Sequence, residues 1–189
     1  MSTSSAPSTS SHSPAPRRAT PEGRRERLRR ILLDRLQAER RTYPATAGQR
    51  ALWLYQQLNP GSAAYNLRFC TRVTGGLRHD DLVSAINRAM RRRPALRSRF
   101  RLVEDSLGTE VVDGLTAADT LTDGTGWSEE DIHSHLDARS MEPFDLETGP
   151  LLRVDCVRRG EDLYAMVTVH HIVADMWSLG LLLDDVLAE

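Results

Sequence analysis

Hydrophobic residues recur along this chain with two periods. Apolar residues three or four positions apart predict helices, and alternation with a period of two predicts strands. Helical spacing is found at residues 24–41, 49–57, 79–92 and 178–188, and a capping-box pattern opens a further short helix at Ser128 that ends before Pro143. Strand patterns are found at residues 65–73, 97–104, 151–158 and 163–170.

The order of these elements predicts the fold class. Turns are expected at residues 59–62 and 159–162, and residues 114–126, rich in Gly, Thr and Asp, are expected to form a loop. Strands and helices mixed in this way predict an α/β fold with a mixed, mostly antiparallel sheet flanked by helices.

Composition narrows the class of protein. The 189 residues, 40% hydrophobic and 27% charged, suit one soluble domain with a core. The chain has no apolar run of about 18 residues and its start does not resemble a secretion signal, so we expect a cytoplasmic protein without a membrane span. Cys70 and Cys156 lie in apolar runs with no metal-binding spacing, and we expect both to be reduced core residues with no metal site.

Charge separates the first part of the chain from the rest. Residues 1–45 hold ten arginines and four acidic residues, whereas the remainder holds 15 basic and 22 acidic residues. Residues 1–19, rich in Ser, Thr and Pro, predict a disordered tail, and residues 20–42 predict a basic amphipathic helix. This helix could be a linker that packs on the main domain or a docking element. Because no aromatic residues are interleaved with its arginines, nucleic-acid binding is disfavoured.

The sequence HHIVADMWS contains the strongest candidate for chemistry. Adjacent side chains on a strand point to opposite faces, so His170 and His171 cannot both reach one metal ion or one reacting atom. One histidine is expected to be buried and the other to face a cleft, where an imidazole can accept a proton. Asp175 would either orient the imidazole or pair with an arginine. From the pattern alone, a buried polar group without a catalytic role remains an alternative.

Four ordered stretches resemble one known family. The string VHHIVADMWS is similar to the HHxxxDG signature of condensation domains of nonribosomal peptide synthetases, members of the chloramphenicol acetyltransferase-like superfamily. Upstream, residues 46–53 (TAGQRALW), 92–100 (RRPALRSRF) and 143–153 (PFDLETGPLLR) resemble further motifs of that family in the same order.

The resemblance implies a reaction and a role for each site residue. In this family the domain joins an acyl or peptidyl thioester on the phosphopantetheine of one carrier protein to the amine of an aminoacyl group on a second carrier. His171 would position or deprotonate that amine, and His170 would be mainly structural. Asp175 would form a salt bridge with Arg92 or Arg97. No cofactor is expected on the chain itself, and phosphopantetheine would come from the carrier proteins.

Departures from the family motifs concern access to the site. The glycine of HHxxxDG is Met176 here, which places a flexible side chain near the substrate, with Trp177 and Ser178 beside it. The His and Glu of the arginine motif are replaced by Arg93 and Pro94.

The family also sets expectations for organisation. Residues 43–189 are expected to be the N-terminal subdomain of a condensation domain, incomplete at the C-terminus and without the second subdomain, and therefore inactive alone. The alternatives are an ester-forming or starter-type acyltransferase of the same superfamily, or a non-catalytic docking or scaffold module.

Overall fold

The computed structural model describes Arg25, Arg29 and residues 42–187. Its helices and strands follow the sequence pattern closely. In chain order they are β1 (Thr42–Pro44), α2 (Ala47–Leu58), β2 (Asn66–Val73), α3 (His79–Arg92), the 3-10 helix η1 (Pro94–Arg97), β3 (Ser98–Val103), β4 (Ser106–Val111), β5 (Ala118–Asp123), α4 (Glu129–Ser140), β6 (Leu152–Arg159), β7 (Asp162–His170) and α5 (Met176–Leu187).

A four-stranded mixed sheet forms the centre of the larger unit of the chain. Its strand order is β2-β7-β6-β5. The pairs β2–β7 and β6–β7 are antiparallel, and β5 runs parallel to β6. Both flanks of β7 are therefore hydrogen-bonded, so the end of this strand, at His170, is held from two sides.

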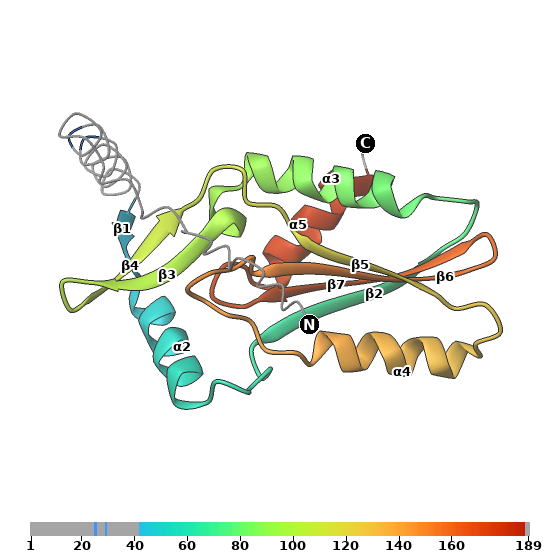
Figure 1. Ribbon diagram of the computed structural model, residues 1–189, viewed down its shortest axis with the longest axis horizontal. Coiled ribbons are helices and arrows are strands. Elements are labelled where there is room, and N and C mark those ends of the chain that lie inside the picture. The colour runs from blue at the N-terminus through green and yellow to red at the C-terminus, as the bar shows by residue number, and fades with distance from the viewer. Residues whose placement is uncertain (1–24, 26–28, 30–41, 188–189) are drawn as a thin grey trace, which may run out of the picture. The chain divides into compact units, whose positions relative to one another are not determined.

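Helices cover both faces of this sheet. Figure 1 shows α3 and α5 on one face and α4 on the other. Alternating residues of β6 and β7 pack against Ile86 and Met90 of α3 and Leu179 of α5. On the opposite face, Ile132 and Leu136 of α4 are fully buried. Because helices cover both faces of the sheet, the residues of β6 and β7 are almost completely buried.

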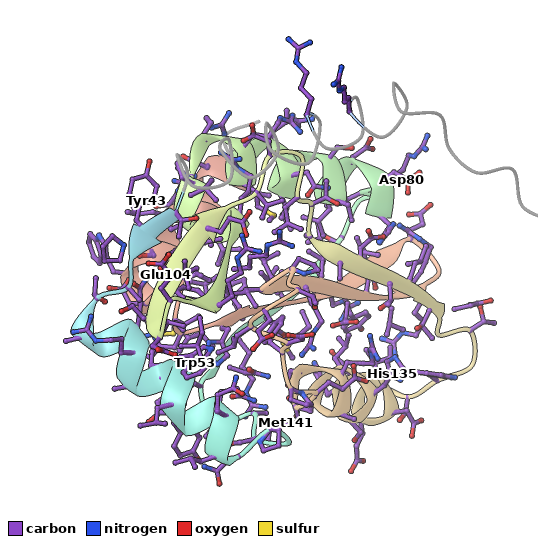
Figure 2. The ribbon with its side chains drawn as sticks, turned by 60° about the vertical axis from the view of Figure 1, so that its left-hand side comes forward. Tyr43, Trp53, Asp80, Glu104, His135 and Met141 are labelled. Atoms are coloured by element: carbon purple, nitrogen blue, oxygen red, sulfur yellow. The ribbon has the colours of Figure 1, made fainter. Side chains whose placement is uncertain are left out.

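A smaller antiparallel sheet, of order β1-β4-β3, lies at one end of the four-stranded sheet. Figure 2 shows Tyr43, Trp53 and Glu104 at this end, where α2 also lies, and His135 of α4 away from it. A separate apolar cluster connects the smaller sheet with the segments next to β6 and β7. Its buried members are Ala45, Phe100, Leu107, Phe144, Leu146, Leu151 and Ile172.

The predicted loop at residues 114–126 is wrong in part, because β5 lies within it. β5 is an edge strand, and its inward side chains are polar: the Thr120 hydroxyl donates to Asp155, and Thr122 lies 3.4 Å from the His135 ring. A strand that places threonines against a polar part of the core lacks the apolar alternation that reveals other strands. The strand β4 was also not predicted from the sequence. The predicted helices and strands between residues 49 and 187 are otherwise confirmed.

The two cysteines differ from each other. Cys156 is buried, as predicted, and burial raises the pKa of its thiol to about 12. The prediction that Cys70 is a core residue is wrong, because it is exposed on the edge strand β2. Burial of part of its surface, together with the charge of Asp137, raises the pKa of the Cys70 thiol. Both thiols are free.

The chain divides into two units, residues 1–40 and 41–189. In the first, Arg25 and Arg29 are helical and exposed. The predicted tail at residues 1–19 lies outside the described residues, as does the predicted helix at residues 20–42 apart from Arg25, Arg29 and Thr42. Thr42 belongs to β1. None of the helices in the described part of the chain combines the length and apolar character needed to cross a membrane.

Candidate active site

The histidine pair lies at the end of β7, where the strand turns toward α5. Leu151, just before β6, accepts a hydrogen bond from the His170 amide at 3.0 Å. Tyr65, just before β2, accepts one from the His171 amide at 2.8 Å. The main chain of both histidines is thus fixed by the strands on either side of β7.

His170 points into the protein and is 1% exposed. Its Nδ1 accepts the amide hydrogen of Ile172 at 3.1 Å, so the proton of the neutral ring lies on Nε2. The Phe144 ring stands edge-on to the imidazole, with centroids 6.1 Å apart. Burial, reinforced by the neighbouring His171, lowers the pKa of His170 to about 4. His170 is therefore neutral at pH 7 and holds the loop that follows it.

His171 is exposed, as expected for the residue after a buried one. Its Nδ1 lies 2.7 Å from the main-chain oxygen of Ala174. A carbonyl oxygen can only accept, so the neutral ring carries its proton on Nδ1 and keeps the lone pair on Nε2. This arrangement can accept a proton from a reactant at the protein surface.

Asp175 makes hydrogen bonds to the start of its own helix. Its Oδ1 accepts the amide hydrogen of Ser178 at 2.7 Å, and its main-chain oxygen accepts that of Leu179 at 2.9 Å, so it caps the first turn of α5. Hydrogen bonds from Ser178 hold the pKa of the Asp175 carboxyl below its ordinary value.

Arg92 and Arg97, the two expected partners of Asp175, each lie near another carboxylate. Arg92 lies 3.8 Å from Asp185, and Arg97 lies 3.3 Å from Asp113. The Arg97 guanidinium also donates to the Met90 carbonyl at 3.2 Å. The partial negative charge at the C-terminal end of α3 therefore also attracts Arg97.

Three residues expected to control access begin α5. Met176 and Trp177 are 60% and 78% exposed, and Ser178 is half-buried. The structure thus places a flexible and an aromatic side chain on the surface directly after the histidine loop.

Sequence reasoning missed the residues that support this loop. The Gln49 side chain of α2 donates to the Ile172 carbonyl at 3.3 Å. Beside the loop is a cavity of about 510 Å³, with Val173, Gln49 and Ser98 in its lining. Gln49 lies in the TAGQRALW motif, which was the available signal, but the motif does not reveal the contact. Among residues 42–187, no cluster of His, Cys, Asp and Glu is arranged to hold a metal ion.

Comparison with known proteins identifies the family. A family model described as the condensation domain matches residues 39–188. The chain belongs to the condensation-domain family. The predicted resemblance and fold class are thereby confirmed, and the histidine loop described above lies within the matched residues.

Relatives of this condensation-domain segment are large synthases. Chondramide synthase cmdD of Chondromyces crocatus is 36% identical over 143 residues, which are 72% of this chain and 4% of that protein. Cyclosporin synthetase simA of Tolypocladium inflatum is 33% identical over 144 residues, 75% of this chain and 1% of the relative. The segment thus spans only a few per cent of the length of these relatives.

Solved structures show the same fold. The starter condensation domain of rhizomide synthetase RzmA superposes with a TM-score of 0.70 at 24% identity, covering 77% of this chain and 36% of that one. The first condensation domain of the CDA synthetase gives a TM-score of 0.65 at 24% identity, covering 77% and 38%.

Proposed function

We propose that this segment supplies the histidine loop of a condensation domain that forms an amide bond between two carrier-bound substrates. The observation that carries the proposal is the exposed His171, whose Nδ1 donates to Ala174 and whose Nε2 remains basic. The donor would be an acyl or peptidyl thioester on the phosphopantetheine of one carrier protein. The acceptor would be the amine of an aminoacyl thioester on a second carrier.

Residues of the histidine loop can assist each step of this reaction. The acceptor nitrogen attacks the thioester carbonyl, the new C–N bond forms, and the C–S bond breaks. His171 Nε2 accepts the proton that the amine loses and returns it to the departing thiolate, which leaves as a thiol. His170, neutral and buried, holds the Ile172 amide and thereby the loop. The Ala174 carbonyl keeps the His171 ring in the tautomer that has a basic Nε2.

The rest of the condensation fold is expected to complete the site. Catalysis of this kind depends on holding two reactants in register. Because the matched region is 36% of the rhizomide starter domain, we expect residues 1–189 alone not to form the amide at a measurable rate.

The test is acyl transfer between two loaded carrier proteins. It compares residues 1–189 alone with a chimaera in which residues 42–187 replace the matching part of the rhizomide starter condensation domain. We expect activity in the chimaera, and its loss in the His171→Ala variant. The control is His133→Ala, which removes another exposed histidine from α4, away from the loop. Equal activity in the His171→Ala and unsubstituted chimaeras would contradict the proposal.

A second reaction of the same superfamily is favoured by Met176. This side chain is 60% exposed at the position where the family motif has glycine. A bulkier residue there reduces the room for the acceptor, and starter condensation domains are among the structural relatives. The segment would then serve a starter-type or ester-forming domain. Profiling amine and hydroxyl acceptors with the chimaera and its Met176→Gly variant separates these reactions.

A further inference from the structure

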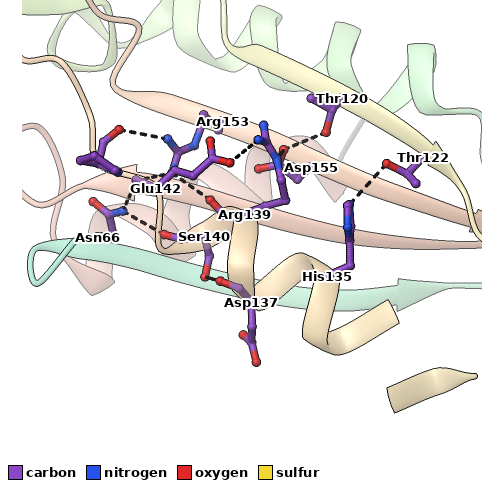
Figure 3. A network of polar contacts seen from close by, with 11 residues as sticks. Asn66, Thr120, Thr122, His135, Asp137, Arg139, Ser140, Glu142, Arg153 and Asp155 are labelled. Carbon is purple, nitrogen blue, oxygen red and sulfur yellow. Dashed lines mark hydrogen bonds and ion pairs between the residues drawn. The ribbon is translucent and has the colours of Figure 1, made fainter. Parts of the chain in front are cut away.

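A polar network between α4 and the four-stranded sheet contains a buried arginine that the proposed reaction does not use. Arg153 of β6 is 9% exposed and pairs in register with Thr168 of β7, two residues before His170. Figure 3 shows its guanidinium among the residues at the end of α4. It donates to the carbonyl oxygens of Glu142 at 2.7 Å, Arg139 at 3.2 Å and Pro143 at 3.4 Å.

The three carbonyl groups that accept hydrogen bonds from Arg153 belong to the last turn of α4 and the residues just after it. The carbonyl groups at the C-terminus of a helix lack partners within the helix and carry partial negative charge. The nearby carboxylate of Asp155 is bound instead by Arg139 and by the Thr120 hydroxyl. Burial lowers the pKa of Arg153. The guanidinium is thus directed at the end of α4 and at the segment that follows it.

The segment held by Arg153 reaches the histidine pair through an aromatic ring. The Arg153 Cζ atom lies 4.1 Å from the centroid of Phe144, whose ring is edge-on to His170. Asn66 of β2, the register partner of His170, also donates to the Glu142 carbonyl, at 2.9 Å. Both strands next to β7 therefore bind the same carbonyl group beside the end of β7.

We propose that Arg153 is a positioning residue for the histidine loop. By fixing Phe144 against His170, it keeps the His170 ring in the orientation that accepts the Ile172 amide. This hydrogen bond in turn fixes the main chain that presents His171. The effect on the loop follows from the contacts described; its importance for catalysis rests on the proposed function.

The chain offers a matched control at the other end of the same strand. Arg159 lies on the same face of β6 and donates to the Trp127 carbonyl at 3.3 Å, just before α4. Its Cζ lies 5.2 Å from the centroid of Tyr164. Arg159 thus makes the same kinds of contact as Arg153, but far from His170. A general loss of packing would affect both variants alike.

The experiment records nitrogen spectra of the imidazoles in residues 1–189 labelled with ¹⁵N-histidine, across a pH titration. In Arg153→Lys and Arg153→Met, we expect His170 to populate both tautomers and to titrate closer to its ordinary pKa, with altered His171 signals. Arg159→Met should leave both histidines as in the unsubstituted chain. A folded Arg153→Lys variant with unchanged signals would overturn the proposal.

Phe144→Leu decides the matter if neither Arg153 variant folds. It keeps an apolar side chain but removes the ring between Arg153 and His170, so the His170 signals should change; unchanged signals would overturn the proposal. In the chimaera, Arg153→Lys should lower kcat by up to about 100-fold with KM nearly unchanged. If His171→Ala does not affect that chimaera, the proposed function fails while the spectroscopic result still stands.

Discussion

The Nδ1 atom of His171 and the main-chain oxygen of Ala174 lie 2.7 Å apart. This contact gives two adjacent histidines opposite roles. His170 accepts a main-chain hydrogen at its Nδ1, whereas His171 donates from its Nδ1. The two rings are therefore opposite tautomers, and only the exposed ring has its basic nitrogen directed away from the loop contact.

The first prediction concerns these tautomers. At a pH where both rings are neutral, nitrogen spectra should show His170 protonated at Nε2 and His171 protonated at Nδ1, because each Nδ1 has a partner that permits only one role. The His170→Asn and His171→Ala variants assign the two signals, because each variant removes one of them. If both loop histidines carry the proton on Nε2, the Ala174 contact does not exist in solution.

The second prediction concerns stability and pH. The folded pKa of His170 is about 4 and its ordinary value is 6.5. Below pH 6.5 the unfolded chain binds a proton at His170 that the native chain does not bind. The free energy of unfolding therefore decreases as the pH is lowered, until His170 is protonated in both states. Between pH 7.5 and 5 this group should remove about 2 kcal/mol from the free energy of unfolding. Urea unfolding at the two pH values measures the loss.

The matching control is His170→Asn, whose amide oxygen can still accept the Ile172 hydrogen but which does not titrate. Its free energy of unfolding should depend less on pH than that of the unsubstituted chain, by the same amount. Identical pH dependence in the two chains would show that another group is responsible.

Local patterns predicted the elements that local chemistry determines. Ser128 and Asp131 form the reciprocal capping box that the sequence indicated at the start of α4, with the Asp131 amide 3.1 Å from the Ser128 hydroxyl. The period of two also predicted one buried and one accessible histidine, which the structure shows for His170 and His171. These features depend on residues within a few positions of one another.

Features that depend on distant partners were not predictable. β5 is stabilised by β6 and by Asp155, which is 35 residues away from Thr120. The carbonyl that Gln49 binds is 123 residues distant. The family resemblance predicts a remote arginine for Asp175, and the structure shows that Asp175 also caps its own helix. A local sequence pattern does not show which hydrogen-bond or ion-pair partner a side chain selects when one of the partners is brought near only by folding.

The third prediction separates the cap from an ion pair at Asp175. Asn caps a helix about as well as Asp, whereas Ala cannot accept the Ser178 hydrogen. Asp175→Asn should therefore keep the melting temperature, and Asp175→Ala should lower it by about 2–4 °C. Thermal unfolding of both variants by circular dichroism is the measurement. If the two variants are equally destabilised, the negative charge of Asp175, and not its hydrogen bond to Ser178, stabilises this turn.

The last prediction compares two glycines in opposite surroundings. A Cβ atom added at Gly124 would lie 2.5 Å from Val157 Cγ1 and 3.2 Å from the Arg158 carbonyl oxygen, so the two main chains could not keep their spacing. Gly124→Ala should lower the free energy of unfolding by about 1–3 kcal/mol. Gly180 lies within α5 with no atom near its added Cβ, and Gly180→Ala should raise it by up to about 1 kcal/mol. Urea unfolding of both variants checks the signs, and a stabilised Gly124→Ala chain would show that β5 and β6 are not packed as described.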